Sequence, residues 1–476
     1  MRWNWLPADQ AAPPPNWHTS GRLNRAALNS LDSLLKRISQ LELTTLTVEK
    51  LVYGGDGLGR LPEGEVLFVP WSAPGDQLQV SRVAGSAKPA KGHIDTILQP
   101  SPDRIEPRCS VFGQCGGCQW QQVAPAAQRD WKRAIVKESL ERIGKLPNVD
   151  VRPTLGSDDT AWAYRNRTQW EVEPAGDELT DTEEYHLGYH AAQSHTVVEF
   201  EHCHIIPDRL NELALALRKQ VRNNPALASG LLRIEAMINQ GGQILLTFEG
   251  EHTPALDALA QTLSADFPDM AGIAHIPSKP GEPTMLQGQP FITETLDGND
   301  FQVSVGSFFQ TNRKAAERIL HTLDELILPD TDSLLDLYAG VGVFALHFKE
   351  KARRILAVES SRSAMADARQ NCDRQSASHI ELKVGDARAV LKGLKETFEV
   401  AIVDPPRAGC QPDVLNWLSS QVKRQLLYVS CNPTTLARDL KFLAAQGWQV
   451  QAVQPIDMFP QTYHVETVVS LVREPA

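Results

Sequence analysis

Between residues 334 and 430 the chain alternates five short apolar runs with helical segments. Each run ends beside a glycine, a carboxylate or a cysteine. Apolar runs of this length predict buried strands. Because helical segments separate them, the pattern predicts a doubly wound, mostly parallel α/β sheet. Two further runs, at 448–453 and 465–472, would complete its edge. The five predicted strands are Leu334–Tyr338, Arg354–Val358, Ile380–Val384, Glu399–Val403 and Gln425–Ser430.

Cys431 stands at the carboxyl end of the fifth predicted strand, where Asn432-Pro433 breaks the strand before a helix. Open α/β folds bind their ligands at this edge of the sheet. A free cysteine is more often a small buried hydrophobe. Position alone therefore leaves both a packing role and a catalytic role open for Cys431.

A Gly-x-Gly turn, from Gly340 to Gly342, follows the first predicted strand and lets a cofactor approach the backbone closely. Sites for NAD, FAD and S-adenosylmethionine share this turn, and Ala345 replaces the third glycine of the dinucleotide fingerprint. Glu359, at the end of the second strand, is placed to accept hydrogen bonds from ribose hydroxyls. Asp404 opens the segment Asp-Pro-Pro-Arg, which is typical of a methyl-transfer loop, although its two prolines also suit a purely structural turn.

The whole chain divides into four predicted parts. Residues 1–41 form an N-terminal extension, disordered or with a short helix. Residues 42–100 predict a small five-stranded barrel of the oligonucleotide-binding (OB) kind, because short strand-like runs alternate with turns. Residues 101–300 form a central region, rich in predicted strands, and residues 301–476 hold the α/β pattern. The strand-like runs in the barrel region are Thr44–Leu51, Glu65–Pro70, Gln77–Val83 and His93–Leu98.

Four of the seven cysteines form a distinctive set. Cys109, Cys115 and Cys118 lie within ten residues of one another, and Cys203 follows Cys118 by 85 residues. Thiolates are soft ligands that suit zinc or an iron–sulfur cluster. Zinc sites more often use two close pairs, whereas three near cysteines and one distant one fit a cubane cluster. The spacing leaves a cluster, zinc and unliganded thiols open. The two histidines flanking Cys203 are rival ligands, for which hydrogen-bonded or solvent-facing roles are favoured.

The net charge and the lengths of the apolar runs limit the kinds of molecule that this protein is expected to bind. The formal net charge is −11, which excludes a sequence-wide basic field, so an RNA partner would be bound through local patches and shape. A predicted amphipathic helix over Ala126–Gly144 carries basic residues on a face expected to be solvated, and Tyr164–Thr168 mixes basic and aromatic residues that suit RNA bases. No apolar run is long enough for a bilayer and no signal pattern opens the chain, so we expect a cytoplasmic protein that is not membrane-bound.

In combination these motifs resemble the uracil-C5 RNA methyltransferases. The specific resemblance is to the branch with a TRAM domain and an iron–sulfur cluster that acts on 23S ribosomal RNA. It covers about residues 45–472, and no counterpart precedes residue 42. Val343 stands where relatives often have asparagine, so a contact there is not carried over. The motifs are the loop Gly54–Arg60, the Cys-x5-Cys-Gly-Gly-Cys triplet, and the segments Ser307–Asn312, Asp336–Gly340, Asp404–Arg407, Ser430–Pro433 and His464–Thr467.

The resemblance implies an OB-like TRAM domain at 42–100, a central iron–sulfur region and a Rossmann-like class I methyltransferase domain at 301–476. It assigns Cys431 as nucleophile and Glu466 as general base. The implied ligands of a [4Fe–4S] cluster are Cys109, Cys115, Cys118 and Cys203. The implied contacts to S-adenosylmethionine are Gln310, Tyr338, Gly340, Glu359, Asp386 and Asp404.

The implied function is methylation of carbon 5 of a specific uridine in 23S rRNA, by a monomer without a stable protein partner. The Cys431 thiolate would add to carbon 6, and Glu466 would remove the carbon-5 proton after methyl transfer. Alternatives are the same chemistry on tRNA and an inactive RNA-binding assembly factor. A cytosine target is disfavoured, because the Asp-Pro-Pro-Arg loop has no cysteine after its prolines.

Overall fold

The computed structural model describes residues 43–83, 90–175, 184–279 and 281–473. They form two compact units, divided between Arg104 and Ile105. The predicted extension at 1–41 lies outside the described residues. Among the helices in these ranges, none combines the length and apolar character needed to cross a lipid bilayer.

The first unit is a five-stranded antiparallel sheet with the order β3-β2-β1-β4-β5. A parallel bridge between Phe68 of β3 and Lys91, directly before β5, connects the two outer strands. Alternate residues such as Leu46 and Val48 point inward and are buried, so the sheet encloses a small core of its own. The strands are β1 (Thr44–Leu51), β2 (Gly57–Arg60), β3 (Val66–Val69), β4 (Gln77–Arg82) and β5 (Gly92–Gln99).

Strand β2 was not predicted, because its glycines were assigned to a turn. The structure gives a different reason for them. A Cβ atom at Gly59 would lie 1.8 Å from Leu46 Cδ1, and one at Gly57 would lie 2.1 Å from Ser72 Oγ. A Cβ atom at Gly59 would also lie 2.6 Å from the backbone carbonyl oxygen of Thr47, so glycine is required there because β2 passes closely over β1. The other four strands begin and end within one residue of their predicted bounds.

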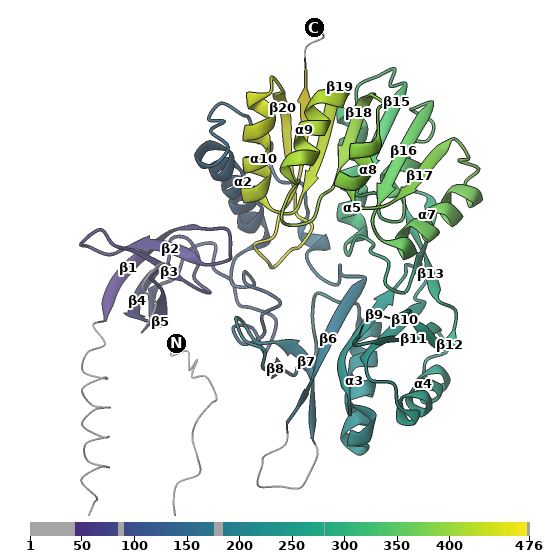
Figure 1. Ribbon diagram of the computed structural model, residues 1–476. Helices are drawn as coiled ribbons and strands as arrows, with labels where there is room; N and C mark the ends of the chain where they lie inside the picture. The colour runs from purple at the N-terminus through teal and green to yellow at the C-terminus, as the bar shows by residue number, and fades with distance from the viewer. Residues whose placement is uncertain (1–42, 84–89, 176–183, 280, 474–476) are drawn as a thin grey trace, which may run out of the picture. The chain divides into compact units, whose positions relative to one another are not determined.

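The second unit contains a central seven-stranded sheet with the order β12-β11-β10-β9-β6-β7-β8. Helices α3 (Asp208–Asn223) and α4 (Pro254–Asp266) pack on one face of this sheet, against a core that includes Trp170 and Phe248 (Figure 1). The strands are β6 (Arg167–Pro174), β7 (Tyr185–His190), β8 (Val197–Val198), β9 (Leu231–Ile238), β10 (Ile244–Gly250), β11 (Met270–Pro277) and β12 (Thr284–Gly288).

The C-terminal sheet has the order β17-β16-β15-β18-β19-β21-β20, and its first five strands are parallel. The predicted doubly wound, mostly parallel sheet is thus confirmed. Helices α5, α6 and α7 pack on one face, and α2, α8, α9 and α10 pack on the other. The strands are β15 (Ser333–Leu337), β16 (Arg354–Glu359), β17 (Ile380–Val384), β18 (Phe398–Val403), β19 (Val422–Ser430), β20 (Gln449–Ile456) and β21 (Glu466–Val472). The helices are α2 (Pro125–Arg142), α5 (Arg313–Leu326), α6 (Val343–His347), α7 (Arg362–Arg374), α8 (Ala387–Gly393), α9 (Pro412–Gln421) and α10 (Pro433–Ala445).

A hairpin of β13 (Phe291–Leu296) and β14 (Asn299–Ser304) shares the apolar core of this sheet. It is fixed by Asp367 of α7. One carboxylate oxygen, Oδ2, accepts hydrogen bonds from the Ser304 N–H at 2.9 Å and the Ser307 hydroxyl at 2.6 Å. The chain that follows the hairpin therefore enters the edge of the sheet in a defined position.

Helix α2 joins the sheet through a buried ion pair. Lys132 is fully buried; its Nζ lies 2.5 Å from Asp457 Oδ1 and donates to the Phe459 carbonyl at 2.9 Å. The basic side chains of this helix were expected to be solvated, but Lys132 is directed at the segment that follows β20. Burial lowers the pKa of Lys132, and the negative charge of Asp457 opposes that shift.

Replacing Lys132 by methionine is expected to lower the free energy of unfolding by about 3–5 kcal/mol, because Asp457 is left buried and unpaired. Urea unfolding followed by circular dichroism measures the change. The double variant Lys132→Met/Asp457→Leu should recover most of the loss. Lys137→Met on the same helix is the control, since its side chain is 59% exposed; an equal loss in that variant would contradict the prediction.

Candidate active site

Cys431 and Glu466 meet at one edge of the C-terminal sheet. Strand β21 runs antiparallel to β19, and Ser430 pairs with Thr467. The last residue of β19 therefore lies opposite the first residues of β21, although they are far apart in sequence. Cys431 is half-buried and Glu466 is 5% exposed. The structure thus brings together the two residues predicted to react.

The turn after β19 is held by Asn432, the N-cap of α10. Its Oδ1 accepts from the Thr434 N–H at 3.0 Å, and its Nδ2 donates to the Arg407 carbonyl at 3.1 Å. The same side chain thus starts the helix and ties it to the loop after β18. Thr435 Oγ1 adds a second bond, at 3.1 Å, to the Arg407 carbonyl. Cys431 is fixed between these two loops.

The charges around Cys431 favour its neutral thiol. Burial raises the pKa of Cys431 to about 12, and the carboxylates of Glu466 and Asp404 act in the same direction. The positive charge of Arg407 acts against them. Burial also raises the pKa of Glu466 well above its usual value, with a further contribution from Asp404. This site concentrates two carboxyl groups and a thiol beside one guanidinium.

His464 adds a neutral ring two residues before Glu466. Burial lowers the pKa of His464 to about 4, and the cations of Arg407, Lys132 and Arg165 reinforce the shift. Its ring contacts Tyr463 at a centroid distance of 4.2 Å. His464 and Arg407 both lie in motifs noted in the sequence, but no role was assigned to them. Their nearness to Glu466 and Cys431 depends on the loop conformations, which the sequence does not reveal.

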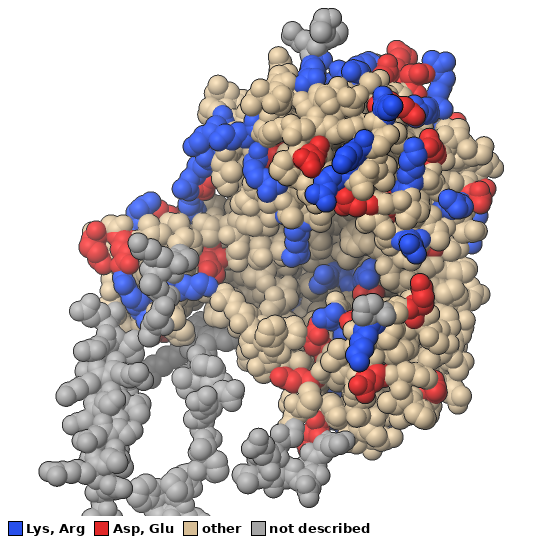
Figure 2. All heavy atoms as spheres, viewed as in Figure 1, with Lys and Arg blue, Asp and Glu red and all other residues tan. Residues whose placement is uncertain are grey.

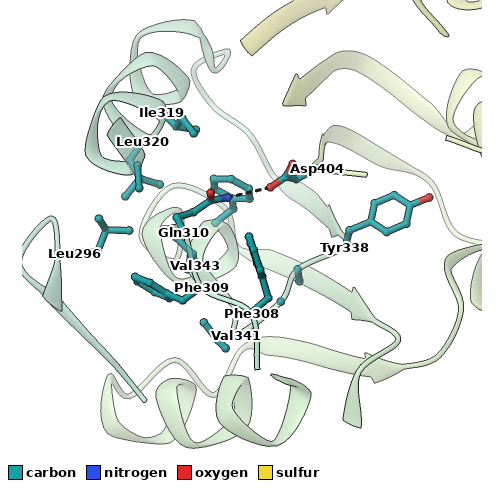
Figure 3. Close-up of a pocket in the computed structure, with 14 residues that line it drawn as sticks. Leu296, Phe308, Phe309, Gln310, Ile319, Leu320, Tyr338, Val341, Val343 and Asp404 are labelled. Atoms are coloured by element: carbon teal, nitrogen blue, oxygen red, sulfur yellow. Dashed lines mark hydrogen bonds between the residues drawn. The ribbon is translucent and has the colours of Figure 1, made fainter. Parts of the chain in front are cut away.

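A pocket opens beside Asp404, at the carboxyl end of β15 (Figure 3). Its wall is mostly apolar. Gln310 and Asp404 both line it, and Gln310 Nε2 donates a hydrogen bond to Asp404 Oδ2 at 3.5 Å. Phe308, which borders the pocket, is 58% exposed. Of the six predicted methyl-donor contacts, four line this pocket: Gln310, Tyr338, Gly340 and Asp404.

The other two predicted contacts lie at the neighbouring strand ends. Glu359 Oε2 accepts from the Gly340 N–H at 3.0 Å, which holds the glycine turn against the end of β16. The Gly385 N–H donates to the Glu359 carbonyl at 2.8 Å. Asp386 is exposed and caps α8 by accepting from the Ala389 N–H at 3.1 Å. Glu359 thus touches the pocket wall through Gly340, whereas Asp386 does not line the pocket.

Asp336 is a further acidic residue that the sequence analysis did not assign. It is fully buried, and its Oδ2 accepts from the Ala345 N–H at 2.9 Å, which fixes the start of α6. Its Oδ1 has no hydrogen-bond partner. Burial raises the pKa of Asp336 to about 7, and Asp404 and Glu359 add to the shift. Asp336 is not among the residues that line the pocket, where Asp404 is the acidic one.

Tyr338 contributes its backbone to the pocket more than its hydroxyl. Its φ is +69°, a left-handed conformation uncommon outside glycine. Figure 3 shows its ring directed away from Gln310 and Asp404. The hydroxyl is hydrogen-bonded to the buried Cys410 thiol. No pattern in the sequence indicates this partner for Tyr338.

The four cysteines of the predicted metal site lie near one another. Burial is the largest cause of the raised pKa of Cys115 and Cys118, and the charges of Cys109 and Cys203 add to both shifts. The Gly117 N–H donates a hydrogen bond to Cys115 Sγ at 3.4 Å. Within the described ranges, however, no three His, Cys, Asp or Glu side chains are arranged to hold one metal ion. The four thiols therefore lie near one another but are not arranged around one metal position.

The histidines beside Cys203 make hydrogen bonds, the role favoured for them. His202 bonds Asp208 at 3.0 Å, and His204 bonds the Arg108 carbonyl at 3.1 Å. Next to them the guanidinium of Arg108 lies 4.6 Å from the ring centroid of Trp162. Within the second unit, Figure 2 shows Lys and Arg side chains around the hollow between the C-terminal and central sheets. This face offers local positive charge despite the acidic total.

Comparisons with known proteins agree with one another. A family model described as tRNA (Uracil-5-)-methyltransferase matches residues 156–474. An uncharacterized RNA methyltransferase of Synechocystis sp. is 34% identical over 451 residues, which cover 91% of this chain and 96% of the relative. Another, from Thermotoga maritima, is 31% identical over 450 residues, with 90% and 99% covered.

The crystal structure of the Pyrococcus abyssi tRNA (uracil-54, C5)-methyltransferase in complex with S-adenosyl-L-homocysteine is similar, with a TM-score of 0.69 at 25% identity. The match covers 90% of this chain and 99% of that chain. The predicted class I methyltransferase α/β fold is therefore confirmed.

Proposed function

Because the chain belongs to the tRNA (uracil-5-)-methyltransferase family, we propose that it methylates carbon 5 of a uridine in RNA, with Cys431 as nucleophile and Glu466 as base. That the protein is an RNA methyltransferase follows from its family and relatives. The residue assignment is supported by one observation above others: Cys431, Glu466 and Asp404 act on one another at the edge where the pocket opens.

Cys431 makes carbon 5 reactive. Carbon 5 of uracil is too weak a nucleophile to take a methyl group directly, but addition of the thiolate to carbon 6 turns the ring into an enolate. The raised pKa of Cys431 keeps the thiol protonated at neutral pH in the free protein. Arg407 is the nearby positive charge that favours the thiolate. The target uracil must leave any base stack to reach Cys431.

Glu466 completes the reaction. After methyl transfer, carbon 5 carries both a methyl group and a proton, and carbon 6 is bonded to sulfur. Glu466 takes the proton, the C5–H electron pair forms the C5=C6 double bond, and the sulfur leaves as thiolate. Burial raises the pKa of Glu466 and so makes its carboxylate a stronger base.

The pocket beside Asp404 is the proposed site of S-adenosylmethionine, which supplies the electrophilic methyl group when bound. Its chemistry fits, because the donor carries positive charge and Asp404, which lines the pocket, can carry a negative charge. Asp404 accepts a hydrogen bond from Gln310, and Asp336, which does not line the pocket, has a carboxylate oxygen without a hydrogen-bond partner. Glu359 and Asp386 are proposed as further contacts at the adjacent strand ends.

Replacing Cys431 by alanine is expected to abolish methylation, since no thiolate remains to activate carbon 5. Wild-type protein incubated with S-adenosylmethionine and RNA containing 5-fluorouridine should form a covalent adduct, because fluorine cannot leave as a proton. Denaturing gel electrophoresis detects the adduct. Cys372→Ala is the control and should still form it. An adduct formed by the Cys431→Ala protein would overturn the assignment, and full activity in that variant would remove the residue from the mechanism.

For the substrate we propose a uridine of 23S rRNA, which rests on the motif resemblance. The proposed TRAM module at 42–100 would assist binding, and the strand order β3-β2-β1-β4-β5 with its closing bridge at Phe68 supports an OB-like barrel. A tRNA uridine is the second candidate, favoured by the likeness to the Pyrococcus abyssi tRNA enzyme.

A deletion strain should lack 5-methyluridine at one position of 23S rRNA and keep it in tRNA, because the proposed enzyme serves one uridine. Mass-spectrometric mapping of both RNAs measures this. Complementation with the wild-type gene, but not with Cys431→Ala, should restore the modification. Loss of the modification from tRNA alone would contradict 23S rRNA as the substrate and would support tRNA instead.

Cys109, Cys115, Cys118 and Cys203 are proposed to hold a [4Fe–4S] cluster. Burial, with a further contribution from Cys203, raises the pKa of Cys109, Cys115 and Cys118, and a cationic centre would stabilise these neighbouring thiols as thiolates. Small side-chain rotations would be needed, since the thiols do not share a centre. No step of the methylation needs an electron, so the proposed role is structural or RNA-positioning.

Protein purified without oxygen should contain one [4Fe–4S] cluster per chain, and Cys118→Ser should lose it, because one ligand of four is removed. Iron and acid-labile sulfide analysis with visible absorbance measures the content. Cys372→Ser should retain the cluster, as this buried cysteine is not among the four. Stoichiometric zinc in place of iron, or iron retained by Cys118→Ser, would contradict the assignment.

A further inference from the structure

The segment between β20 and β21, residues 457–465, leads directly into Glu466. It lies among buried residues but belongs to no strand or helix, so its backbone groups need partners from elsewhere. At its centre Gln461 is fully buried and has a φ of +69°. A non-glycine residue in this left-handed region costs about 1–3 kcal/mol and persists only where surrounding contacts impose it.

Successive carbonyl groups of this segment are each held by a different part of the chain. Asn312 Nδ2 donates to the Met458 carbonyl at 2.9 Å, and Tyr164 Oη donates to the Pro460 carbonyl at 3.0 Å. Lys132 of α2 holds the Phe459 carbonyl, as described above. These contacts fix the path of the backbone on both sides of Phe459.

Gln128 makes the most complete set of contacts with the segment. Its Oε1 accepts from the Gln461 N–H at 2.9 Å, and its Nε2 donates to Gln461 Oε1 at 3.0 Å. The same Nε2 donates to the Trp120 and Val123 carbonyls at 2.9 and 2.8 Å. One amide group therefore connects α2, the segment before it and Gln461. Gln128 and Lys132 lie one helical turn apart, so a single face of α2 holds both ends of 457–461.

Gln461 is also bonded to the residues that directly follow the cysteine triplet. The N–H groups of Gln119 and Trp120 both donate to the Gln461 carbonyl, each at 3.0 Å. These two residues directly follow Cys118. The thiol-bearing segment and the segment that carries the base thus share one bonded residue, although 333 positions separate Gln128 from Gln461.

We propose that Gln128 is a positioning residue for the methylation reaction, which locks Gln461 in its left-handed conformation and thereby aims Glu466. The proposal rests on the proposed function, in which Glu466 removes the carbon-5 proton. Displacing a reacting group by about 1 Å costs up to about a hundredfold in rate. A loosened segment therefore slows proton removal and leaves addition by Cys431 and methyl transfer in place.

The test uses Gln128→Leu, which keeps the side-chain volume and removes all four bonds of the amide. With unmodified RNA and S-adenosylmethionine, we expect kcat to fall about tenfold with KM nearly unchanged. A covalent adduct, bonded through sulfur at carbon 6 and methylated at carbon 5, should accumulate on denaturing gels. The adduct with 5-fluorouridine RNA should form at the wild-type rate, because it forms before the impaired step.

Two further variants make the result specific. Gln461→Gly suits the left-handed backbone and should fold normally. It keeps the bond from its N–H to Gln128 Oε1 but loses the side-chain bond from Gln128 Nε2, so the same adduct should accumulate to a smaller extent. Gln425→Leu is the matched control, because Gln425 is equally buried and its side chain bonds Leu326, Leu328 and Ser470 at the opposite end of β19. It should show no adduct.

Unchanged kcat in Gln128→Leu would overturn the proposal. So would equal loss in Gln425→Leu, or a slower 5-fluorouridine reaction with no accumulating adduct, which would place the defect before proton removal. Wild-type protein that never traps 5-fluorouridine RNA would instead overturn the proposed function itself, and the positioning role with it.

Discussion

The reversal of one strand determines which residues meet at one edge of the C-terminal sheet. In the C-terminal sheet the parallel strands place their carboxyl ends at one edge, which collects Tyr338, Glu359, Asp404 and Cys431. Strand β21 runs the other way, so its amino end arrives at the same edge. This direction brings Glu466 to the side of the sheet where Cys431 lies. A parallel β21 would put the carboxylate at the far side of the sheet.

A second constraint is charge balance. The edge gathers Asp336, Glu359, Asp404 and Glu466, and burial raises the pKa of three of them: Asp336, Asp404 and Glu466. Arg407 is the cation that acts on both Cys431 and Glu466. Such an excess of buried acid is unfavourable for an empty protein but favourable for a site that receives a cationic ligand. The raised pKa values of these carboxyl groups are thus compatible with the proposed binding of a positively charged methyl donor at this edge.

Much of this could be predicted from the sequence, because the information is local. Five apolar runs with their terminal glycine, acid or cysteine were sufficient to place the parallel strands and the edge. Strand β2 was missed since its glycines serve close packing against Leu46, a contact between segments that no local pattern encodes. The burial of Lys132 was missed for the same reason: its partner Asp457 is 325 positions away. The direction of the Tyr338 ring and the conformation of Gln461 depend on a positive φ, which sequence patterns signal only for glycine.

The high pKa of Cys431 has a consequence for the life of the protein in a cell. Thiolates, and not thiols, are the forms that peroxides and electrophiles attack. A thiol whose pKa is raised by burial, as that of Cys431 is, forms less thiolate than an ordinary cysteine at the same pH. The burial that raises the pKa of Cys431 therefore also slows the reaction of this thiol with oxidants.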